Sequence, residues 1–224
     1  MLSQAATNDP AMCGQLDYAI PEGQFYATPP EYVDCLAHYV DLSQRRIWEP
    51  AAGEGHIAKR IAEITGREVY ATDLFDRGFC PAGVDFIEQK RMLNDDIEDI
   101  VTNPPYGDEA EPFVRHAIEL TKETGGMVAM FLRNEWDCSS DDRPDLFEGH
   151  PAYAMKIVVT KRPRWFAGSK GSPRHNYAWF IWDWSNVDRF QALREQVGMS
   201  SPRHPPIRYI HPRDARPIGQ HSVH

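Results

Sequence analysis

The feature that most constrains the fold is a regular alternation of short apolar segments with helix-like segments between residues 45 and 133. The predicted segments are a strand, turn and helix over 45–64, strands over 68–74, 84–88, 97–106 and 126–133, and a helix over 111–123 that Gly125-Gly126 ends. Strands that alternate with helices favour an α/β fold with a mostly parallel, doubly wound sheet. In such sheets, ligands bind beyond the carboxyl ends of the strands.

The 224 residues predict one domain with an extension at each end. A helix is expected over 29–40, a polar and partly helical segment over 134–153, strands over 155–162 and 177–184, and a last helix over 187–197. The expected organisation is a flexible segment over 1–24, a catalytic domain over 25–197, and a basic tail over 198–224 that is rich in Pro, Arg and His and lacks a core of its own.

The first predicted strand leads into EPAAGEGH, residues 49–56. Gly53 and Gly55 allow the backbone to approach a ligand closely, and the helix that follows presents free N–H groups. A plain strand-to-helix turn would have the same pattern. The missing third glycine disfavours a dinucleotide site. Glu49 is unsuited to a pyrophosphate and suits a cation such as an amino-acid ammonium group.

Two further strand ends carry carboxylates. Asp73 follows the glycine turn by about twenty residues, the position from which a carboxylate accepts hydrogen bonds from ribose hydroxyls. Asp85 and Phe86 offer an acceptor for an adenine amino group and a ring beside it. Each is more often structural when taken singly. Together with Glu49 they describe a nucleoside with an amino-acid end, which indicates S-adenosylmethionine.

The stretch DIVTNPPYG, residues 99–107, completes a resemblance to the class I S-adenosylmethionine-dependent methyltransferases, and specifically to the NPPY-type adenine-N6 DNA methyltransferases of small phage-like size. FYATPP, EPAAGEG, ATD and VDF resemble the family's motifs in the gamma order, and the similarity covers about residues 24–184. It implies a Rossmann-like, seven-stranded methyltransferase sheet that is mostly parallel with an antiparallel last strand. It also implies S-adenosylmethionine contacts from Tyr26, Thr28, Pro29, Glu49, Ala51, Gly53, Asp73, Leu74, Asp85, Phe86, Asn103 and Phe113.

The TNPPYG motif explains how an amine could react. The exocyclic amine of adenine is a poor nucleophile, because its lone pair is delocalised into the ring. The side-chain oxygen of Asn103 and the carbonyl of Pro104 can accept its protons and free the lone pair. Pro104 and Pro105 fix the direction of both acceptors, and Tyr106 offers a face for a flipped base. A proline-stiffened turn with an Asn cap is the structural alternative.

The net charge of −9 is unevenly distributed. Residues 1–148 carry about −17 and residues 149–224 about +8, and a one-sided basic surface is typical of phosphate binding. The loop between the last two predicted strands combines basic and aromatic residues that suit phosphates and bases: Arg162, Arg164, Trp165, Phe166, Lys170 and Arg174. Trp165 or Phe166 would face the flipped base, and the sequence does not distinguish them. DNA is the expected partner, and the oligomeric state is left open.

Several classes are disfavoured. Four widely spaced cysteines fit a reducing cytoplasm and argue against a zinc site or a disulfide framework, so no metal is expected. No run of 18 apolar residues is present, which predicts no membrane span, and the N-terminus does not resemble a signal peptide. Methylation of RNA adenine or protein glutamine remains an alternative substrate assignment. A non-catalytic nucleic-acid-binding or cofactor-sensing module is a second alternative, against which Asn103 and Tyr106 argue.

Overall fold

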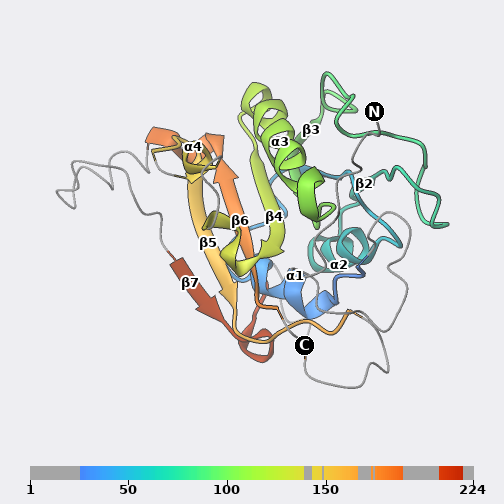
Figure 1. The fold of residues 1–224 in the computed structure, drawn as a ribbon. Coiled ribbons are helices and arrows are strands. Elements are labelled where there is room, and N and C mark those ends of the chain that lie inside the picture. Colours follow the sequence, from blue (N-terminus) through green and yellow to red (C-terminus); the bar gives the residue numbers. More distant parts are fainter. Residues whose placement is uncertain are drawn as a thin grey trace, which may run out of the picture.

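A computed structural model describes residues 26–138, 143–147, 149–165, 173, 175–188 and 207–218. Seven strands form one sheet in the order β2-β1-β3-β4-β6-β5-β7 (Figure 1). They are β1 Arg46–Glu49, β2 Tyr70–Ala71, β3 Ile97–Thr102, β4 Met127–Arg133, β5 Tyr153–Val159, β6 Tyr177–Asp183 and β7 Ile207–Ile210. β6 runs antiparallel to both β4 and β5, and the other pairings are parallel. The predicted seven-stranded α/β sheet, mostly parallel with an antiparallel strand, is confirmed.

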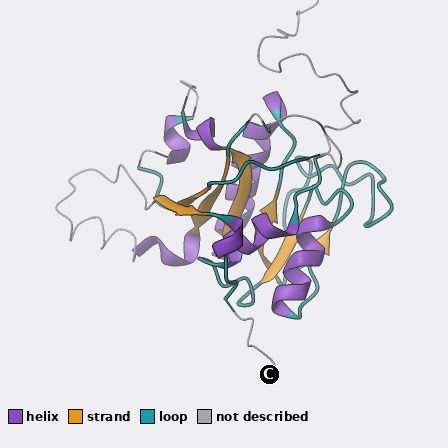
Figure 2. Cartoon of the chain, turned by 90° about the horizontal axis from the view of Figure 1, so that it is seen from below, coloured by secondary structure: helices purple, strands orange, loops and turns teal. Residues whose placement is uncertain are grey.

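Helices cover both faces of this sheet (Figure 2). The α-helices are α1 Pro30–Ala37, α2 His56–Thr65, α3 Ala110–Thr124 and α4 Pro144–Phe147, with 3-10 turns at Gly107–Glu109, Asn134–Asp137, Trp184–Asn186 and Pro212–Asp214. α1 and α2 pack on one face around Phe131 and Trp179, whereas α3 and α4 pack on the other around Met130 and Phe180. Within the described part of the chain, no helix combines the length and apolar character needed to cross a bilayer.

The strand expected over 84–88 is wrong. This segment belongs to an irregular stretch between β2 and β3, in which the Asp85 carboxylate accepts a hydrogen bond from the Ile87 N–H at 3.0 Å. Such a local side-chain bond competes with the pairing that a strand requires. Phe86 is nevertheless buried, because its ring packs edge-on against Trp48.

The sheet reaches seven strands through the C-terminal segment instead. β7 pairs in parallel with β5, and its Ile210 joins the core together with Ala215. The Ile218 N–H then donates to the Ala37 carbonyl at the end of α1. Residues 207–218 of the expected tail are therefore part of the main fold. Of the helix expected over 187–197, only the first two residues are described, and they are helical.

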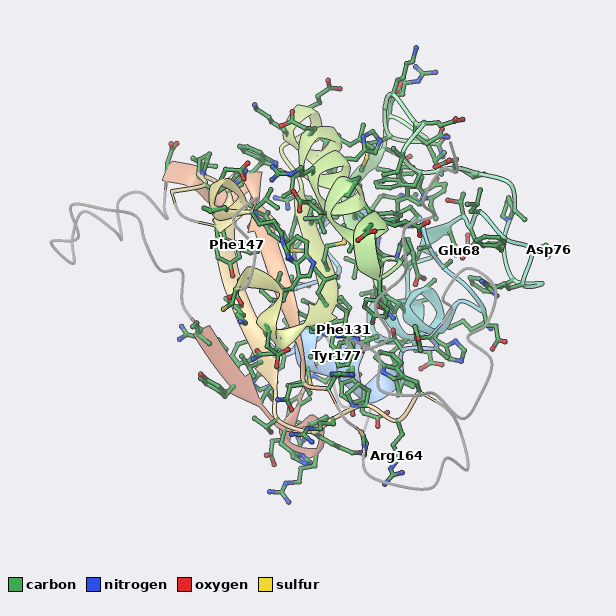
Figure 3. All side chains as sticks on the ribbon, in the orientation of Figure 1. Glu68, Asp76, Phe131, Phe147, Arg164 and Tyr177 are labelled. Atoms are coloured by element: carbon green, nitrogen blue, oxygen red, sulfur yellow. The ribbon has the colours of Figure 1, made fainter. Side chains whose placement is uncertain are left out.

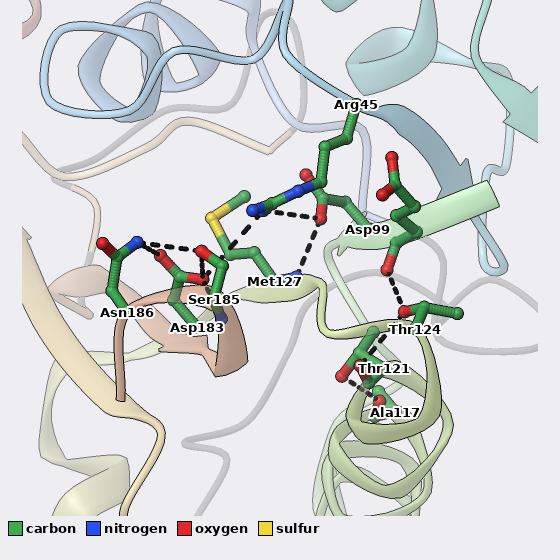
Figure 4. A network of polar contacts seen from close by, with 10 residues as sticks. Arg45, Asp99, Ala117, Thr121, Thr124, Met127, Asp183, Ser185 and Asn186 are labelled. Atoms are coloured by element: carbon green, nitrogen blue, oxygen red, sulfur yellow. Dashed lines mark hydrogen bonds and ion pairs between the residues drawn. The ribbon is translucent and has the colours of Figure 1, made fainter. Parts of the chain in front are cut away.

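The amino ends of the central strands are joined by a polar network (Figure 4). The Asp99 carboxylate on β3 accepts from the Met127 N–H of β4 at 2.8 Å and lies 3.4 Å from the Arg45 guanidinium. Gly126 has no space for a side chain, because an added Cβ would lie 1.9 Å from the Glu98 carbonyl oxygen. This end of the sheet fixes β3 against β4 and so determines where the opposite end of β3 delivers Asn103.

Candidate active site

A cavity of about 380 Å³ opens beyond the carboxyl ends of β1, β2 and β3. Of the predicted cofactor residues, ten line it: Tyr26, Thr28, Glu49, Ala51, Asp73, Leu74, Asp85, Phe86, Asn103 and Phe113. Pro29 and Gly53 are not among the lining residues. Gly53 contributes to the cavity indirectly: its N–H donates at 2.7 Å to the carboxylate of Asp73, which is a lining residue. Segments far apart in the sequence thus meet at the edge of the sheet where ligands of doubly wound folds bind.

Asp73 holds the cavity wall together. One carboxylate oxygen accepts from the Gly53 N–H, and the other accepts from the Phe75 N–H at 2.8 Å. The bond to Gly53 helps to fix the glycine turn, in which Gly53 and Gly55 have φ angles of 56° and 77°. A side chain at Gly55 would overlap the ring of Phe79. Each Asp73 oxygen keeps a second lone pair, so the group can still accept from a ligand.

Glu49 is the most deeply buried carboxylate of the cavity, with 1 % of its surface exposed. One of its oxygens accepts from the Ala58 N–H in the first turn of α2 at 2.8 Å. Burial raises the pKa of Glu49 well above its usual value, and the charge of Asp73 adds to this shift. No Lys or Arg among the described residues forms an ion pair with Glu49. A buried carboxylate without a cation suits a cationic ligand.

An apolar region lies on the other side of the cavity. The rings of Phe86 and Phe113 are 4.3 Å apart between centroids, and both line the cavity. Leu74 and Ile87 also line it and are 50 % and 44 % exposed. Aliphatic side chains that line one cavity together with two rings can enclose a flat heterocycle. The cavity therefore combines a carboxylate end with an apolar end.

Asn103 follows β3 directly, and its side chain is held in one orientation. Its amide nitrogen donates to the Tyr26 carbonyl and to the Thr28 hydroxyl, both at 3.1 Å. The amide oxygen therefore points away from Tyr26 and Thr28 as the acceptor of the side chain. It accepts a hydrogen bond from the Tyr106 hydroxyl at 2.6 Å. A carboxamide oxygen has two lone pairs. A substrate amine would share this oxygen with Tyr106 or displace its hydroxyl.

Aromatic rings lie beside Asn103, around the Tyr106 ring whose hydroxyl bonds its side chain. Tyr106 packs against Tyr26 at 5.4 Å and against Tyr177 at 6.0 Å between ring centroids. Trp165 contacts the same two rings at 5.5 and 5.0 Å. Burial raises the pKa of the Tyr106 hydroxyl well above its usual value, so it stays protonated and able to donate. We call Tyr26, Tyr106, Trp165 and Tyr177 the aromatic cluster.

The predicted basic loop is described only in part. Trp165 belongs to the aromatic cluster, whereas Phe166, Lys170 and Arg174 lie outside the described residues, as does most of the loop. The Arg162 guanidinium donates to the Asn176 side chain at 2.8 Å and to the Pro173 carbonyl at 3.1 Å. It therefore braces the two ends of the loop. Arg164 lies at the margin of the molecule, and Figure 3 shows it well separated from Phe131 and Tyr177.

Sequence reasoning missed several residues of the site. Arg77, Asp108 and Glu109 line the cavity but belong to no recognisable motif. Tyr177 is buried in β6, and it also contacts Tyr106. Its place in β6, where it pairs with Arg133 at the end of β4, was the only signal that could have placed it at this edge of the sheet.

Comparison with solved structures places the fold among methyltransferases. The chain resembles the methyltransferase subunit of a type I restriction-modification system from Streptococcus thermophilus, with TM-score 0.53 and 10% identity over 70% of this chain and 44% of that one. It also resembles the type IIG restriction endonuclease BpuSI, with TM-score 0.51 and 14% identity over 72% of this chain and 26% of that one. The chain thus spans less than half the length of both proteins.

A third similar structure is closer in size. A protein from Pyrococcus horikoshii, proposed to be an RNA methyltransferase, gives TM-score 0.51 and 15% identity over 71% of this chain and 87% of that one. No protein-family model and no curated protein sequence matches the chain. At these identities the similarity defines the class of fold.

Proposed function

We propose that this protein transfers a methyl group from S-adenosylmethionine to the N6 amino group of adenine in DNA. The observation that carries the proposal is the position of Asn103. Its oriented amide oxygen lies at the carboxyl end of β3, on the wall of a cavity that also contains Glu49 and Asp73. The similarity of the fold to methyltransferases of restriction-modification systems supports this assignment.

The cavity fits the proposed cofactor in its chemistry. Glu49 suits the ammonium group of a methionine end, Asp73 suits ribose hydroxyls, and the apolar end between Phe86 and Phe113 suits adenine. S-adenosylmethionine supplies an electrophilic methyl group when it is bound. The protein residues orient the substrate amine: the Asn103 side-chain oxygen and the Pro104 carbonyl accept hydrogen bonds from its two N–H groups, and the consecutive prolines fix both acceptors before the substrate arrives. One amine proton then passes to water.

The charge distribution supports a nucleic-acid substrate. Residues 149–224 carry about +8 and include the loop that contributes Trp165 to the aromatic cluster. A base that is stacked within a duplex cannot reach Asn103 beside the aromatic cluster. The target base would therefore have to flip out of the double helix. RNA is the second candidate substrate, because the similar structure from Pyrococcus horikoshii is proposed to act on it.

Methyl transfer from radiolabelled S-adenosylmethionine to DNA made by PCR, to RNA transcripts and to a protein extract tests the proposal directly. Label in DNA, located at N6 of adenine by nucleoside mass spectrometry, is the expected result. Asn103→Ala should reduce the rate by about 10²–10³, the usual cost of one preorganised acceptor or donor. Asn94→Ala, at an exposed asparagine before β3, is the matched control and should keep the wild-type rate. Label confined to RNA or protein would reject DNA as the substrate.

A further inference from the structure

Arg133 stands at the same edge of the sheet as the candidate active site. It is the last residue of β4, and its cross-strand partner in β6 is Tyr177 of the aromatic cluster. β4 runs parallel to β3 with Met130 opposite Thr102, the residue before Asn103. The end of β4 therefore extends past the level at which β3 turns into the TNPPYG motif.

Arg133 differs from four other shielded cations in having no acidic partner among the described residues. Arg45, Arg60 and Arg143 have exposed side-chain fractions of 25%, 21% and 19%, and each has a carboxylate within 4.0 Å. The buried Lys156 is paired with Asp137 at 2.8 Å. Arg133 is also half-buried, but no ion pair joins it to any carboxylate of the described residues. Removing a guanidinium partly from water without a counter-ion costs free energy.

The charge of Arg133 acts on the hydroxyl group of Tyr177, its neighbour in β6. Burial raises the pKa of Tyr177, and the nearby Arg133 guanidinium opposes the rise. A neutral phenol does not neutralise a cation, so the site retains a positive charge beside the aromatic cluster. Figure 3 shows Tyr177 next to Phe131, on the side of the sheet that α1 and α2 cover. A cation and stacked rings at one site match the two parts of a nucleotide, the phosphate and the base.

We infer that Arg133 binds a backbone phosphate adjacent to the target nucleotide, while the base lies against Tyr106 and Trp165. The inference rests on the proposed function and narrows its substrate class. A nucleic acid carries an anion one ribose away from the reacting base, whereas a protein glutamine carries none at a fixed distance. The planar guanidinium can donate two parallel hydrogen bonds to one phosphate.

The salt dependence of KM for methyl transfer tests this contact. On PCR-made duplex DNA, Arg133→Gln should reduce the magnitude of the log–log salt slope by about 0.9, the value for one phosphate contact, and raise KM. Arg133→Lys should keep the wild-type slope, because the charge remains, but should raise KM through the lost bidentate geometry. Lys122→Gln makes the same change in charge at the opposite end of the sheet, where Lys122 stacks on Trp184, and should leave the slope unchanged.

Two further measurements separate the possible failures. Arg133→Gln should unfold at the same temperature as the wild type. If Arg133→Gln does not fold, Arg133→Met is measured in its place, because Met keeps the aliphatic stem of the side chain. The same slopes are measured by fluorescence anisotropy with a labelled duplex and S-adenosylhomocysteine. A wild type that binds DNA but transfers no methyl group to it rejects the proposed function. Equal slopes for wild type and Arg133→Gln overturn the phosphate contact, whether or not methyl transfer occurs.

Discussion

Glu49 and Asp99 are both buried carboxylates in neighbouring strands, but they lie at opposite ends of the sheet. Asp99 accepts from the Met127 N–H and faces the Arg45 guanidinium, so its charge has a partner within the protein (Figure 4). Glu49 accepts from the Ala58 N–H but has no Lys or Arg partner in the described part of the chain. Glu49 faces the cavity, and Asp99 does not.

We interpret this difference as one between a structural group, Asp99, and a group proposed to bind a ligand, Glu49. Burial raises the pKa of both carboxyls, so both have a desolvation cost. At Asp99 that cost is partly offset by Arg45, and the result is a fixed junction between β3 and β4. At Glu49 no Lys or Arg of the described residues offsets it, and the offset can come from a bound cation. A site built for a cationic ligand is expected to keep an acceptor of this kind.

The largest expected effect concerns Asp99 and the stability of the fold. Burial raises the pKa of Asp99 from 3.8 to about 6, although the Met127 N–H and Arg45 oppose the rise. The folded state therefore holds this proton to higher pH than the unfolded state. The free energy of unfolding should fall by about 3 kcal/mol as pH rises from about 4 to about 6, at about 1.4 kcal/mol per pKa unit.

Asp99→Asn keeps the acceptor for Met127 and removes the titration. Urea unfolding of both proteins between pH 4 and pH 7 should show the variant gaining about 3 kcal/mol relative to the wild type over this window. A constant difference between the two proteins across the window would mean that Asp99 titrates normally. The affinity for S-adenosylmethionine should be equal in both.

The sequence predicts the features that depend on neighbouring residues better than the features that depend on the folded chain. The TNPPYG turn was predictable, because two prolines fix two φ angles after an apolar run, and Glu49 and Asp73 carry chemistry that is visible locally. Phe113 was predicted from the family resemblance alone. The strand over 84–88 failed because the Asp85 side chain bonds its own backbone. β7 was missed because its pairing partner, β5, lies about 50 residues earlier and only the folded chain brings them together. The bond from Tyr106 to Asn103, and the lack of a carboxylate beside Arg133 among the described residues, likewise depend on the folded chain.

The second prediction compares ligand binding by Glu49→Gln and by Asp99→Asn, so that each variant is the control for the other. Glu49→Gln should weaken S-adenosylmethionine about tenfold or more, because a hydrogen bond to a charged group contributes roughly 1.5–3 kcal/mol. Asp99→Asn removes a carboxylate of similar burial from outside the cavity and should leave the dissociation constant unchanged. Isothermal titration calorimetry measures both. Equal weakening by the two variants would indicate that Glu49 acts through general stability and not through contact with the ligand.

The smallest expected effect is a fraction of a proton, and it tests the role of Glu49 most specifically. Burial raises the pKa of Glu49, so the free protein holds a proton on this group to higher pH than an exposed carboxyl does. A bound cation stabilises the carboxylate, lowers this pKa and releases the proton. Affinity for S-adenosylmethionine should therefore rise with pH until the free carboxyl is ionised, and it should fall as the group is protonated.

Calorimetry in two buffers of different ionisation enthalpy should report release of less than one proton per site in the wild type. Glu49→Gln should abolish that part of the buffer dependence, and Asp99→Asn should keep it. Proton uptake in the wild type, or equal buffer dependence in Glu49→Gln, would show that the cation of the ligand lies elsewhere in the cavity. The remaining carboxylates to examine would then be Asp73, Asp85, Asp108 and Glu109.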